Sequence, residues 1–462
     1  LFPDYPNTYI NLSNVYRLKG LYSLAIETIL KCPNTDLPQY WFSLSRLNLE
    51  TGNINDACTN SLRAVVKLHE YDPSIMKESF HYGQAFYDSM NTMYYTTTGG
   101  ATLLDFLYTD TPLLTEKIIF NLHKSYTDQP YKFLKSRKNI TRIGIVSEAF
   151  RDNAVIQVVL PILKVLYEEQ KIEVYGYYLS SDVTQDELSP SIMRLFTKAY
   201  NYKFNKNTKE IVEQMKVDTL DVLIGIDGNT FNKKTIPLFQ HRIAPVQIDA
   251  WGYPFSTGIA NIDYKIVDSI TDTTNEYYTE RLIMMGRCFL VWEPPCVFTP
   301  TKEQKKQFVC NNFYKKLNKT TLTLWKRILE KSGVPLVIKE PPEYYKKIIE
   351  ECLGEQYSLV RYSKRKDSYS DYFEELSQSK VYLDPVTYNG TISLLNALYC
   401  NVNVVTLTGN THRSRVGTSI LTAIDHRSGI ATTEDEYINK AIEAINGETD
   451  NVREKLLESC IF

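Results

Sequence analysis

The sequence lacks the cysteine arrangements that build a disulfide framework or a zinc site. Its eight cysteines are scattered over 462 residues, and none forms a Cys-x-x-Cys pair. Disulfide-rich domains and structural zinc sites both depend on closely and regularly spaced cysteines. We therefore expect neither a disulfide framework nor a zinc site, and a reducing compartment, with the cytoplasm as the first expectation and the nucleus as the alternative.

An excess of one charge and a long apolar run are also missing. The chain has 52 basic and 54 acidic residues, a net charge of -2, so it lacks the positive excess of nucleic-acid and membrane-surface binders. A membrane helix needs about 18 apolar residues in a row. The nearest segment, "VIQVVLPILKVL", is interrupted by Gln157, Pro161 and Lys164. We expect neither a nucleic-acid partner nor a membrane span.

An internal repeat is present near the start of the chain. "GLYSLA" (Gly20–Ala25) recurs as "GNINDA" (Gly52–Ala57). A glycine that joins two helices tightly and a small alanine where they pack, at a period of about 34 residues, are typical of tetratricopeptide repeats. A plain helical hairpin is the alternative interpretation. We predict repeats over residues 1–72, with more before Leu1, because two repeats alone make a poor solenoid.

From residue 140 onward, short β-branched runs alternate with helix-length segments. The runs "RIGIVS" and "LDVLIGID" belong to a first block, and "QFVCNNF", "VYLDP" and "VNVVTLTG" to a second. Two such blocks predict an α/β fold with two parallel-sheet lobes, which we assign to residues 140–298 and 299–462. Residues 73–139 are predicted to form a helical linker region. Ligands bind beyond the carboxyl ends of parallel strands, so we expect a site between the lobes.

Two successive helix starts in the second block carry small polar residues, glycine and arginine. In "TYNGTIS", Asn389, Gly390, Thr391 and Ser393 stand where unpaired backbone N–H groups and the helix dipole favour an anion such as a diphosphate. The same residue types are also ordinary helix caps. The second start, "GNTHRSRVG", adds Arg415 at the same edge of the sheet. Together they favour a phosphate site.

Long stretches of the chain resemble one enzyme family. "YNGTISLLNALYCNVNVVTLTGNTHRSRVGTSILTAI", "HRIAPVQIDAWGYPFSTGIANIDYKIVDSIT" and "FVCNNFYKKLNKTTLTLWKRIL" are similar, in order and spacing, to segments of the O-GlcNAc transferase/SPINDLY family. The resemblance runs from Arg142 to the end of the chain, and tetratricopeptide repeats before such a region also fit. It implies two Rossmann-like lobes in the GT-B arrangement. It further implies transfer of a sugar to Ser/Thr of proteins, with inversion and without a required metal.

The resemblance also implies the partners, a nucleotide sugar and a protein or peptide acceptor. The residues "CNNF" and "YNG" lean towards users of UDP-linked sugars, so N-acetylglucosamine from UDP-GlcNAc is the expected donor. A GDP-fucose donor, as in SPINDLY proteins, is the alternative. A lysine and helix-start N–H groups would stabilise the leaving diphosphate.

The catalytic lysine of the family falls on Lys316, nine residues before Trp325. The loop before it is shorter than the family's, so Lys315 competes for the role, and both could simply be solvated loop lysines. Lys339, at the end of "PLVIKE", matches a basic position that can reach the cleft.

Several polar positions depart from the family. Asn153 stands where relatives carry a histidine, and an amide cannot take a proton, so no general base is implied there. Asn396 replaces an acidic residue that holds the ribose, and Tyr372 aligns with a histidine that stacks on the base. Asp227 and Asp249 are the nearest acidic candidates for a base, although a structural role is the simpler interpretation.

The predicted site residues fall into three groups. The catalytic group is Lys316. The donor-binding group is Asn389, Gly390, Thr391, Ser393, Asn396, Arg415, His412, Tyr372 and Lys339. The cleft or acceptor group is Asn153, Tyr253, Pro254, Thr257 and His241. Because the scaffold motifs are kept while polar positions change, two hypotheses stand: an active glycosyltransferase with an unusual donor pocket, or a degenerate relative that serves as a repeat-based scaffold.

Overall fold

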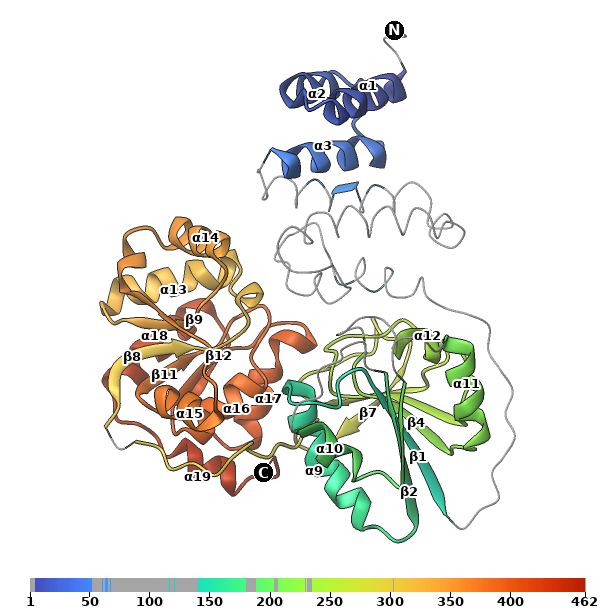
Figure 1. Cartoon of the computed structure of the whole chain (residues 1–462). Helices are drawn as coiled ribbons and strands as arrows, with labels where there is room; N and C mark the ends of the chain where they lie inside the picture. Colours follow the sequence, from blue (N-terminus) through green and yellow to red (C-terminus); the bar gives the residue numbers. More distant parts are fainter. Residues whose placement is uncertain are drawn as a thin grey trace. The chain divides into compact units, whose positions relative to one another are not determined.

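The computed structural model describes residues 5–51, 60, 63, 64, 67, 116, 120, 140–179, 188–202, 207–228, 230, 235–301 and 303–461. The chain divides into two units, Leu1–Ser125 and Tyr126–Phe462. Figure 1 shows the helices of the first unit and the two sheets of the second. In the part of the chain that is described, no helix combines the length and apolarity needed to cross a membrane.

The described part of the first unit is helical, with α1 (Pro6–Leu18), α2 (Tyr22–Leu30) and α3 (Pro38–Glu50). Gly20 joins α1 to α2 with a φ of +73°, a backbone conformation that favours glycine. The hydroxyl of Ser13 donates to the carbonyl of fully buried Ala25 at 2.8 Å, so the two helices pack closely at the small residue. The second copy of the motif and nearly all of residues 73–139 lie outside the described residues, so the repeat and linker assignments stay predictions.

The first lobe of the second unit is a parallel sheet in the order β3-β2-β1-β4-β5-β6-β7. The chain runs outward from β1 to β3, and then returns to β4 on the other side of β1. Right-handed crossovers place α9 and α10 on one face, and α11 and α12 on the other, as Figure 1 shows. The elements are β1 (Thr141–Ser147), α9 (Ala154–Glu168), β2 (Ile172–Tyr178), α10 (Leu188–Met193), β3 (Lys198–Asn201), α11 (Thr208–Val217), β4 (Val222–Gly225), α12 (Thr235–Phe239), β5 (Val246–Asp249), β6 (Tyr264–Asp268) and β7 (Arg281–Met285).

The second lobe is a parallel sheet in the order β10-β9-β8-β11-β12-β13. The predicted α/β class with two parallel-sheet lobes is therefore confirmed. Its elements are β8 (Lys305–Cys310), η1 (Tyr314–Lys316), α13 (Lys319–Ser332), β9 (Leu336–Lys339), α14 (Glu343–Leu353), η2 (Gly354–Leu359), β10 (Val360–Ser363), α15 (Tyr369–Ser377), β11 (Ser379–Leu383), α16 (Ile392–Tyr399), β12 (Asn403–Leu407), η3 (His412–Ser414), α17 (Val416–Ala423), η4 (Arg427–Gly429), β13 (Ile430–Ala431), α18 (Glu434–Asn446) and α19 (Val452–Leu457).

The strand order of each lobe reverses at one point. In the second lobe the chain leaves β8 in one direction and β11 in the other, so the loops that follow β8 and β11 diverge to opposite faces. In the first lobe the same occurs between β1 and β4. Such a switch point leaves a crevice at the carboxyl ends of the two strands, where ligands of open α/β sheets bind.

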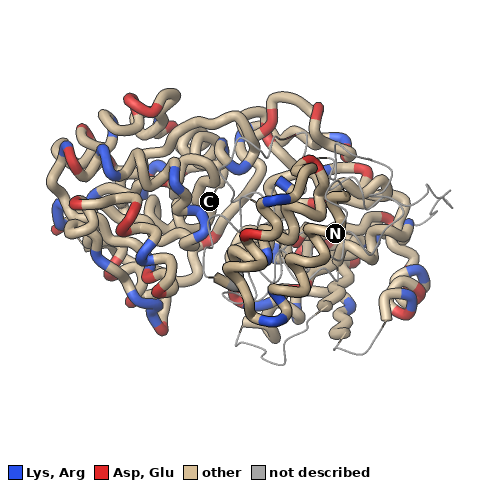
Figure 2. Tube along the Cα trace, turned by 90° about the horizontal axis from the view of Figure 1, so that it is seen from above, with Lys and Arg blue, Asp and Glu red and all other residues tan. Residues whose placement is uncertain are grey.

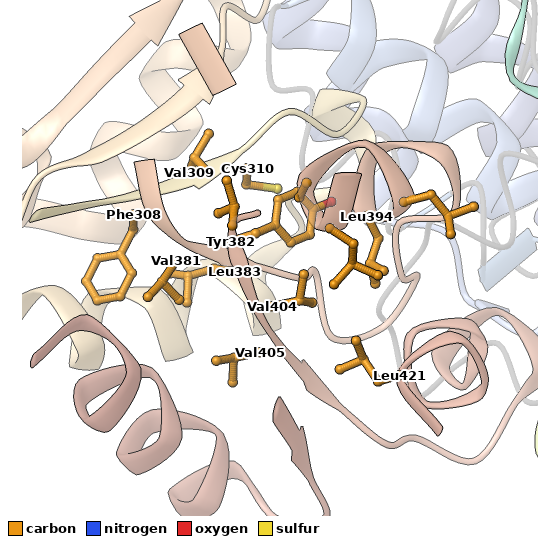
Figure 3. Close-up of a cluster of buried hydrophobic side chains, with 14 of the residues drawn as sticks. Phe308, Val309, Cys310, Val381, Tyr382, Leu383, Leu394, Val404, Val405 and Leu421 are labelled. Atoms are coloured by element: carbon orange, nitrogen blue, oxygen red, sulfur yellow. The ribbon is translucent and has the colours of Figure 1, made fainter. Parts of the chain in front are cut away.

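The core of the second lobe lies directly beneath its switch point. Figure 3 shows side chains of the three neighbouring strands β8, β11 and β12 packed together, with Leu394 of α16 and Leu421 of α17 against them. Apart from exposed Lys305 and Lys306 at the start of β8, these strands are almost completely buried, as expected for a parallel sheet covered on both faces. The loops that emerge from this core therefore begin from fixed positions.

Candidate active site

Lys316 lies at the switch point of the second lobe. It ends η1 after β8, and its Nζ donates to the carbonyl oxygen of Asn389 at 2.7 Å, in the turn that leads from β11 to α16. The same Nζ lies 4.1 Å from the centroid of the Tyr388 ring, close enough for a cation–π interaction. The side chain of Lys315 instead lies near the ring of Phe313, 5.9 Å from its centroid. The geometry therefore separates the two lysines and directs Lys316 to the start of α16.

The surroundings of Lys316 lower the pKa of its ammonium group. Burial lowers the pKa of this half-buried lysine to about 8, while the charge of Asp384 and the thiol of Cys310 act in the opposite direction. Asp384 is fully buried at the end of β11, and burial raises the pKa of its carboxyl group. A lysine with a lowered pKa beside a crevice is a candidate functional residue.

Both the carboxylate and the backbone carbonyl of Asp384 accept hydrogen bonds. Its two carboxylate oxygens accept hydrogen bonds from the backbone N–H of Gly390 at 2.6 Å and from the hydroxyl of Thr406 at 2.7 Å. Its carbonyl accepts from the Tyr437 hydroxyl at 2.8 Å, and that hydroxyl in turn accepts from the indole of Trp325 at 3.0 Å. Helices α13 and α18 therefore support the turn from beneath.

At the start of α16, two side-chain hydroxyl groups lie close to the backbone of Gly390. A Cβ on Gly390 would lie 2.6 Å from both the Ser393 hydroxyl and the Tyr382 hydroxyl. Ser393 donates to Asn312 at 2.8 Å, which ties α16 to the loop after β8. Thr391, the N-cap residue, makes no side-chain capping bond. The first turn of α16 therefore lacks a protein cap at a place where a helix start favours an anion.

Asn389 supports this turn from inside the protein. Its backbone N–H donates to the carbonyl of Arg413, and its side-chain amide donates to Pro385, both at 2.8 Å. Its side-chain oxygen accepts from the N–H of Gly417 at 3.1 Å. The side chain is fully buried, so the structure uses Asn389 to join the starts of α16 and α17, with its carbonyl as the part that meets Lys316.

Asn396 and Tyr372, both predicted to bind the nucleoside, lie together. Asn396 is 4% exposed, and its side-chain oxygen is buried without a hydrogen-bond partner among the described residues. Burial raises the pKa of Tyr372, and interactions with the amides of Asn396 and Asn311 oppose that change. An unsatisfied buried acceptor is costly unless a ligand satisfies it, so this cluster fits a group that donates hydrogen bonds, such as a hydroxyl.

His412 and Arg415 do not join this cluster. His412 Nδ1 lies 2.6 Å from the carboxylate of Asp272 in the first lobe, and Arg415 donates to the carbonyls of Gly409 at 2.8 Å and Ile270 at 3.4 Å. Burial would raise the pKa of Asp272, but His412 and the hydroxyl groups around it hold that pKa below its usual value. His412 and Arg415 therefore bridge the two lobes, and their donor-binding role stays a prediction.

Lys339 is exposed at the end of β9, the strand next to β8, and Lys316 lies in the segment that follows β8. Burial of part of the side chain and repulsion from Arg365 lower its pKa. The structure therefore places Lys339 in a second group of cations along the same sheet edge.

The predicted cleft residues of the first lobe are occupied in supporting contacts. The side-chain oxygen of Asn153 caps α9 by accepting from the N–H of Val155 at 2.9 Å, and its amide donates to the carbonyls of Ala149 and Arg151 at 2.7 and 2.9 Å. This explains why an asparagine can stand at that position without any acid–base role.

The remaining three motif positions are buried, and His241 is exposed elsewhere. Thr257 donates to Glu280, and Tyr253 and Pro254 are buried beside it. His241 precedes β5 and therefore lies at the amino ends of the strands, the edge opposite to the crevice. The role of these four residues in the cleft therefore stays a prediction.

The two candidate bases are fully buried at strand ends. Asp227 accepts from the Ser147 hydroxyl at 2.8 Å and from the N–H of Glu148 at 2.6 Å, and burial raises its pKa to about 7. Asp249 forms an ion pair with Lys265. Asp227 joins the ends of β4 and β1 at the switch point of the first lobe, and Asp249 joins β5 to β6, so both side chains have structural contacts.

Three residues that contact the candidate site or bridge the lobes were not predicted from the sequence. Tyr388 beneath Lys316 and Asn312 beside Ser393 belong to turns whose internal geometry no periodicity reveals. Tyr369, at the start of α15, donates to Asp152 of the first lobe at 2.7 Å and accepts from Gln157 at 2.8 Å. The only available indication was position: each follows a buried strand by a few residues, where the crevice lies.

Comparison with known proteins agrees with this architecture. Residues 109–307 match the family model described as glycosyl transferase family 41. The chain is 29% identical over 342 residues to an Arabidopsis thaliana SPINDLY protein, and 28% identical over 345 residues to a Hordeum vulgare SPINDLY protein. Both carry the name probable UDP-N-acetylglucosamine–peptide N-acetylglucosaminyltransferase. The matches cover 70% and 71% of this chain, but only 36% of each relative.

A solved structure shows the same fold. A lysine mutant of the Thermobaculum terrenum O-GlcNAc transferase superposes with a TM-score of 0.71 at 20% identity, over 99% of this chain and 86% of that one. The described residues contain no group of three or more His, Cys, Asp or Glu side chains suited to a metal ion. The chain thus matches glycosyl transferase family 41 over residues 109–307, is similar to SPINDLY proteins over about 70% of its length, and shares the fold of a solved O-GlcNAc transferase.

Proposed function

We propose that the chain is an inverting glycosyltransferase that moves a sugar from a nucleotide sugar, with UDP-GlcNAc as the expected donor, onto Ser or Thr of proteins. The observation that carries the proposal is the position of Lys316, whose Nζ lies 2.7 Å from the Asn389 carbonyl at the uncapped start of α16. A cation and a helix start converge there on one point of the crevice.

The chemistry follows from that convergence. When the bond between sugar and diphosphate breaks, negative charge develops on the leaving oxygen. The ammonium of Lys316 donates a hydrogen bond to that charge, and the N–H groups at the start of α16 add a fixed dipole. Lys316 is largely protonated at neutral pH, because its lowered pKa of about 8 is still above 7.

The nucleoside end is proposed to lie against Asn396 and Tyr372. The unpaired side-chain oxygen of Asn396 can accept from a ribose hydroxyl, and the ring of Tyr372 can stack on a base. Asn389, Gly390 and Ser393 act behind these contacts by fixing the turn. Asp227, Asp249 and Asn153 already have hydrogen-bond partners, so the proposal assigns no side chain as base for the acceptor hydroxyl.

Donor cleavage tests the proposal. Purified protein is incubated with radiolabelled UDP-GlcNAc, UDP-glucose and GDP-fucose, and release of free sugar is measured for the wild type, Lys316→Ala and Lys315→Ala. We expect hydrolysis of one donor, a loss of about hundredfold or more in Lys316→Ala, and little change in Lys315→Ala. Equal losses in both variants would contradict the assignment of Lys316.

A degenerate scaffold is the second candidate, and one observation favours it. His412 and Arg415, two of the basic side chains nearest the crevice, are taken up by contacts between the lobes. Calorimetric titration with UDP and GDP distinguishes the candidates. Binding of either nucleotide that is weakened in Asn396→Leu supports the enzyme, whereas no binding of any nucleotide supports the scaffold.

A further inference from the structure

Three exposed cations lie side by side on the carboxyl edge of the second sheet. Lys339 ends β9, and Lys364 and Arg365 follow β10 directly. The two strands are in register with Ser363 opposite Lys339, and the N–H of Glu340 donates to the carbonyl of Ser363 at 2.8 Å. We call Lys339, Lys364 and Arg365 the β9–β10 basic cluster.

The carboxylates around the cluster are already paired with other lysines. Lys346 binds Glu340 at 2.8 Å and Glu343 at 3.1 Å, and Lys366 binds Glu375 at 3.0 Å. Within the described part of the chain, no ion pair joins a carboxylate to any of the three cluster residues, and this includes the nearby Asp367. The charge of Lys364 also lowers the pKa of Glu340, but that carboxylate is already paired with Lys346, so the three cations exceed the unpaired carboxylates beside them.

This arrangement is unusual for the chain as a whole. Its net charge is -2, and Figure 2 shows Lys and Arg interspersed with Asp and Glu along the trace. Inside the cluster, partial burial and the charge of Arg365 lower the pKa of Lys339, so the like charges act on each other. Such repulsion lowers stability unless an anion lies against it, which indicates a ligand of opposite charge.

The strand order connects the cluster with the candidate active site. β9 lies between β10 and β8, so the cluster and Lys316 occupy successive carboxyl ends of one sheet. The hydroxyl of Tyr345, on α14, donates to the carbonyl of Leu317 at 3.1 Å and fixes the connection between the two loops. A ligand laid along this edge would run from the cluster towards the crevice.

We propose that the β9–β10 basic cluster binds an acidic stretch of an extended polypeptide. Alternate side chains of an extended chain face the same side and lie about 6.6 Å apart, which suits cations on neighbouring strands that are about 4.8 Å apart. Three charges are few for a nucleic acid or a membrane, whose binding depends on many cations. That this stretch belongs to the acceptor rests on the proposed function, but the binding itself does not.

Fluorescence anisotropy tests the binding without any sugar donor. A fluorescein-labelled peptide of alternating Glu and Ser is titrated with the full chain, and a peptide of alternating Gln and Ser is the neutral control. We expect the Glu peptide to bind, with an affinity that falls as salt is raised, and the Gln peptide to bind far more weakly. Lys364→Gln/Arg365→Gln should weaken binding of the Glu peptide roughly tenfold.

A matched variant controls for net charge. Lys306 and Lys331 are exposed at the opposite, amino edge of the same sheet, and Lys306→Gln/Lys331→Gln removes the same two charges. We expect this variant to bind the Glu peptide like the wild type. An equal loss in both double variants would overturn the proposal, because a general charge effect would then explain the binding.

A charge swap keeps the test decisive if a neutral variant proves unstable. Lys364→Glu/Arg365→Glu should lose the Glu peptide and gain a peptide of alternating Lys and Ser. No binding of the Glu peptide overturns the proposal, and so does tighter, cluster-dependent binding of a labelled single-stranded oligonucleotide or of vesicles with anionic lipid. Donor hydrolysis measured in parallel separates this outcome from failure of the proposed function, since it does not require the peptide.

Discussion

Each lobe of the second unit holds a lysine that its surroundings remove from water, and the two lysines are treated in opposite ways. Lys265 in the first lobe is 1% exposed, forms an ion pair with Asp249 and donates to the carbonyl of Tyr253 at 2.8 Å. Among the residues that the structure describes, Lys316 in the second lobe reaches a backbone carbonyl and an aromatic ring but no carboxylate within ion-pair distance, and burial lowers its pKa.

The difference between the two lysines separates a cation that stabilises the fold from one that is available to a ligand. A buried cation that is fully paired contributes to the fold, and removal of one partner leaves the other charge uncompensated. A cation that is left without a direct carboxylate contact costs stability, and proteins retain such groups where they act on a ligand. The paired lysine of the first lobe therefore supports the fold, and Lys316 at the switch point of the second lobe is the one available to a ligand.

The largest expected effect comes from breaking the paired lysine. Lys265→Met leaves Asp249 buried and unpaired, so we expect the free energy of unfolding to fall by about 3–5 kcal/mol. Denaturant unfolding followed by tryptophan fluorescence measures this. The double variant Lys265→Met/Asp249→Leu should recover much of the loss, and a loss below about 1 kcal/mol in the single variant would show that the pair is dispensable.

A smaller loss is expected from crowding the second switch point. A Cβ on Gly417 would lie 2.5 Å from the Asp384 carboxylate, so Gly417→Ala should destabilise the protein by about 1–3 kcal/mol. A Cβ on Gly286, after β7, would meet nothing within 4 Å, and Gly286→Ala should change stability by less than about 0.5 kcal/mol. Thermal unfolding of both variants checks the contrast, which fails if the two melt together.

The lowered pKa of Lys316 predicts a pH dependence of nucleotide binding. The ammonium is present below a pH of about 8 and is lost above it, so the affinity for UDP should decrease as pH rises through this value. The phosphate itself changes little there, because its second pKa is about 6. Calorimetry at pH 7, 8 and 9 should show the decrease in the wild type and a flat profile in Lys316→Arg, whose side chain stays charged.

The smallest expected effect is on stability when Lys316 is removed. Because its pKa is lower in the folded chain than in the unfolded chain, the charged form destabilises the fold below a pH of about 8, and this contribution disappears as pH rises. Lys316→Met should therefore leave the free energy of unfolding at pH 7 unchanged or higher. A loss like that of Lys265→Met would mean that the two lysines are structural alike.

The sequence could predict the two sheets and the edge where the site lies, because strands buried on both faces read as apolar runs and ligands bind at their carboxyl ends. It placed Lys316 and the turn around Gly390, which the structure brings together. The partners of polar groups could not be predicted. Whether Arg415 or His412 faces a nucleotide or the other lobe depends on contacts more than 100 residues away in the chain.

The sequence also could not show whether the side chain of an asparagine caps a helix or is available to a ligand. Asn153 is the N-cap of α9 and Asn396 lies one turn inside α16; the first satisfies its side-chain oxygen locally, and the second has no partner for it among the described residues. The residues around each asparagine in the sequence do not distinguish these two cases. Only the three-dimensional packing of α16 against α15 decides which amide remains available.

The bridges between the lobes have a consequence for how the protein unfolds. Asp268 accepts from the Ser419 hydroxyl at 2.6 Å and Asp272 binds His412, so buried polar groups of each lobe depend on the other for their partners, and an exposed hydrogen bond from Tyr369 to Asp152 adds to these bridges. If one lobe opened alone, it would leave these groups unsatisfied. The two sheets are therefore expected to melt in a single cooperative transition, although each has its own hydrophobic core.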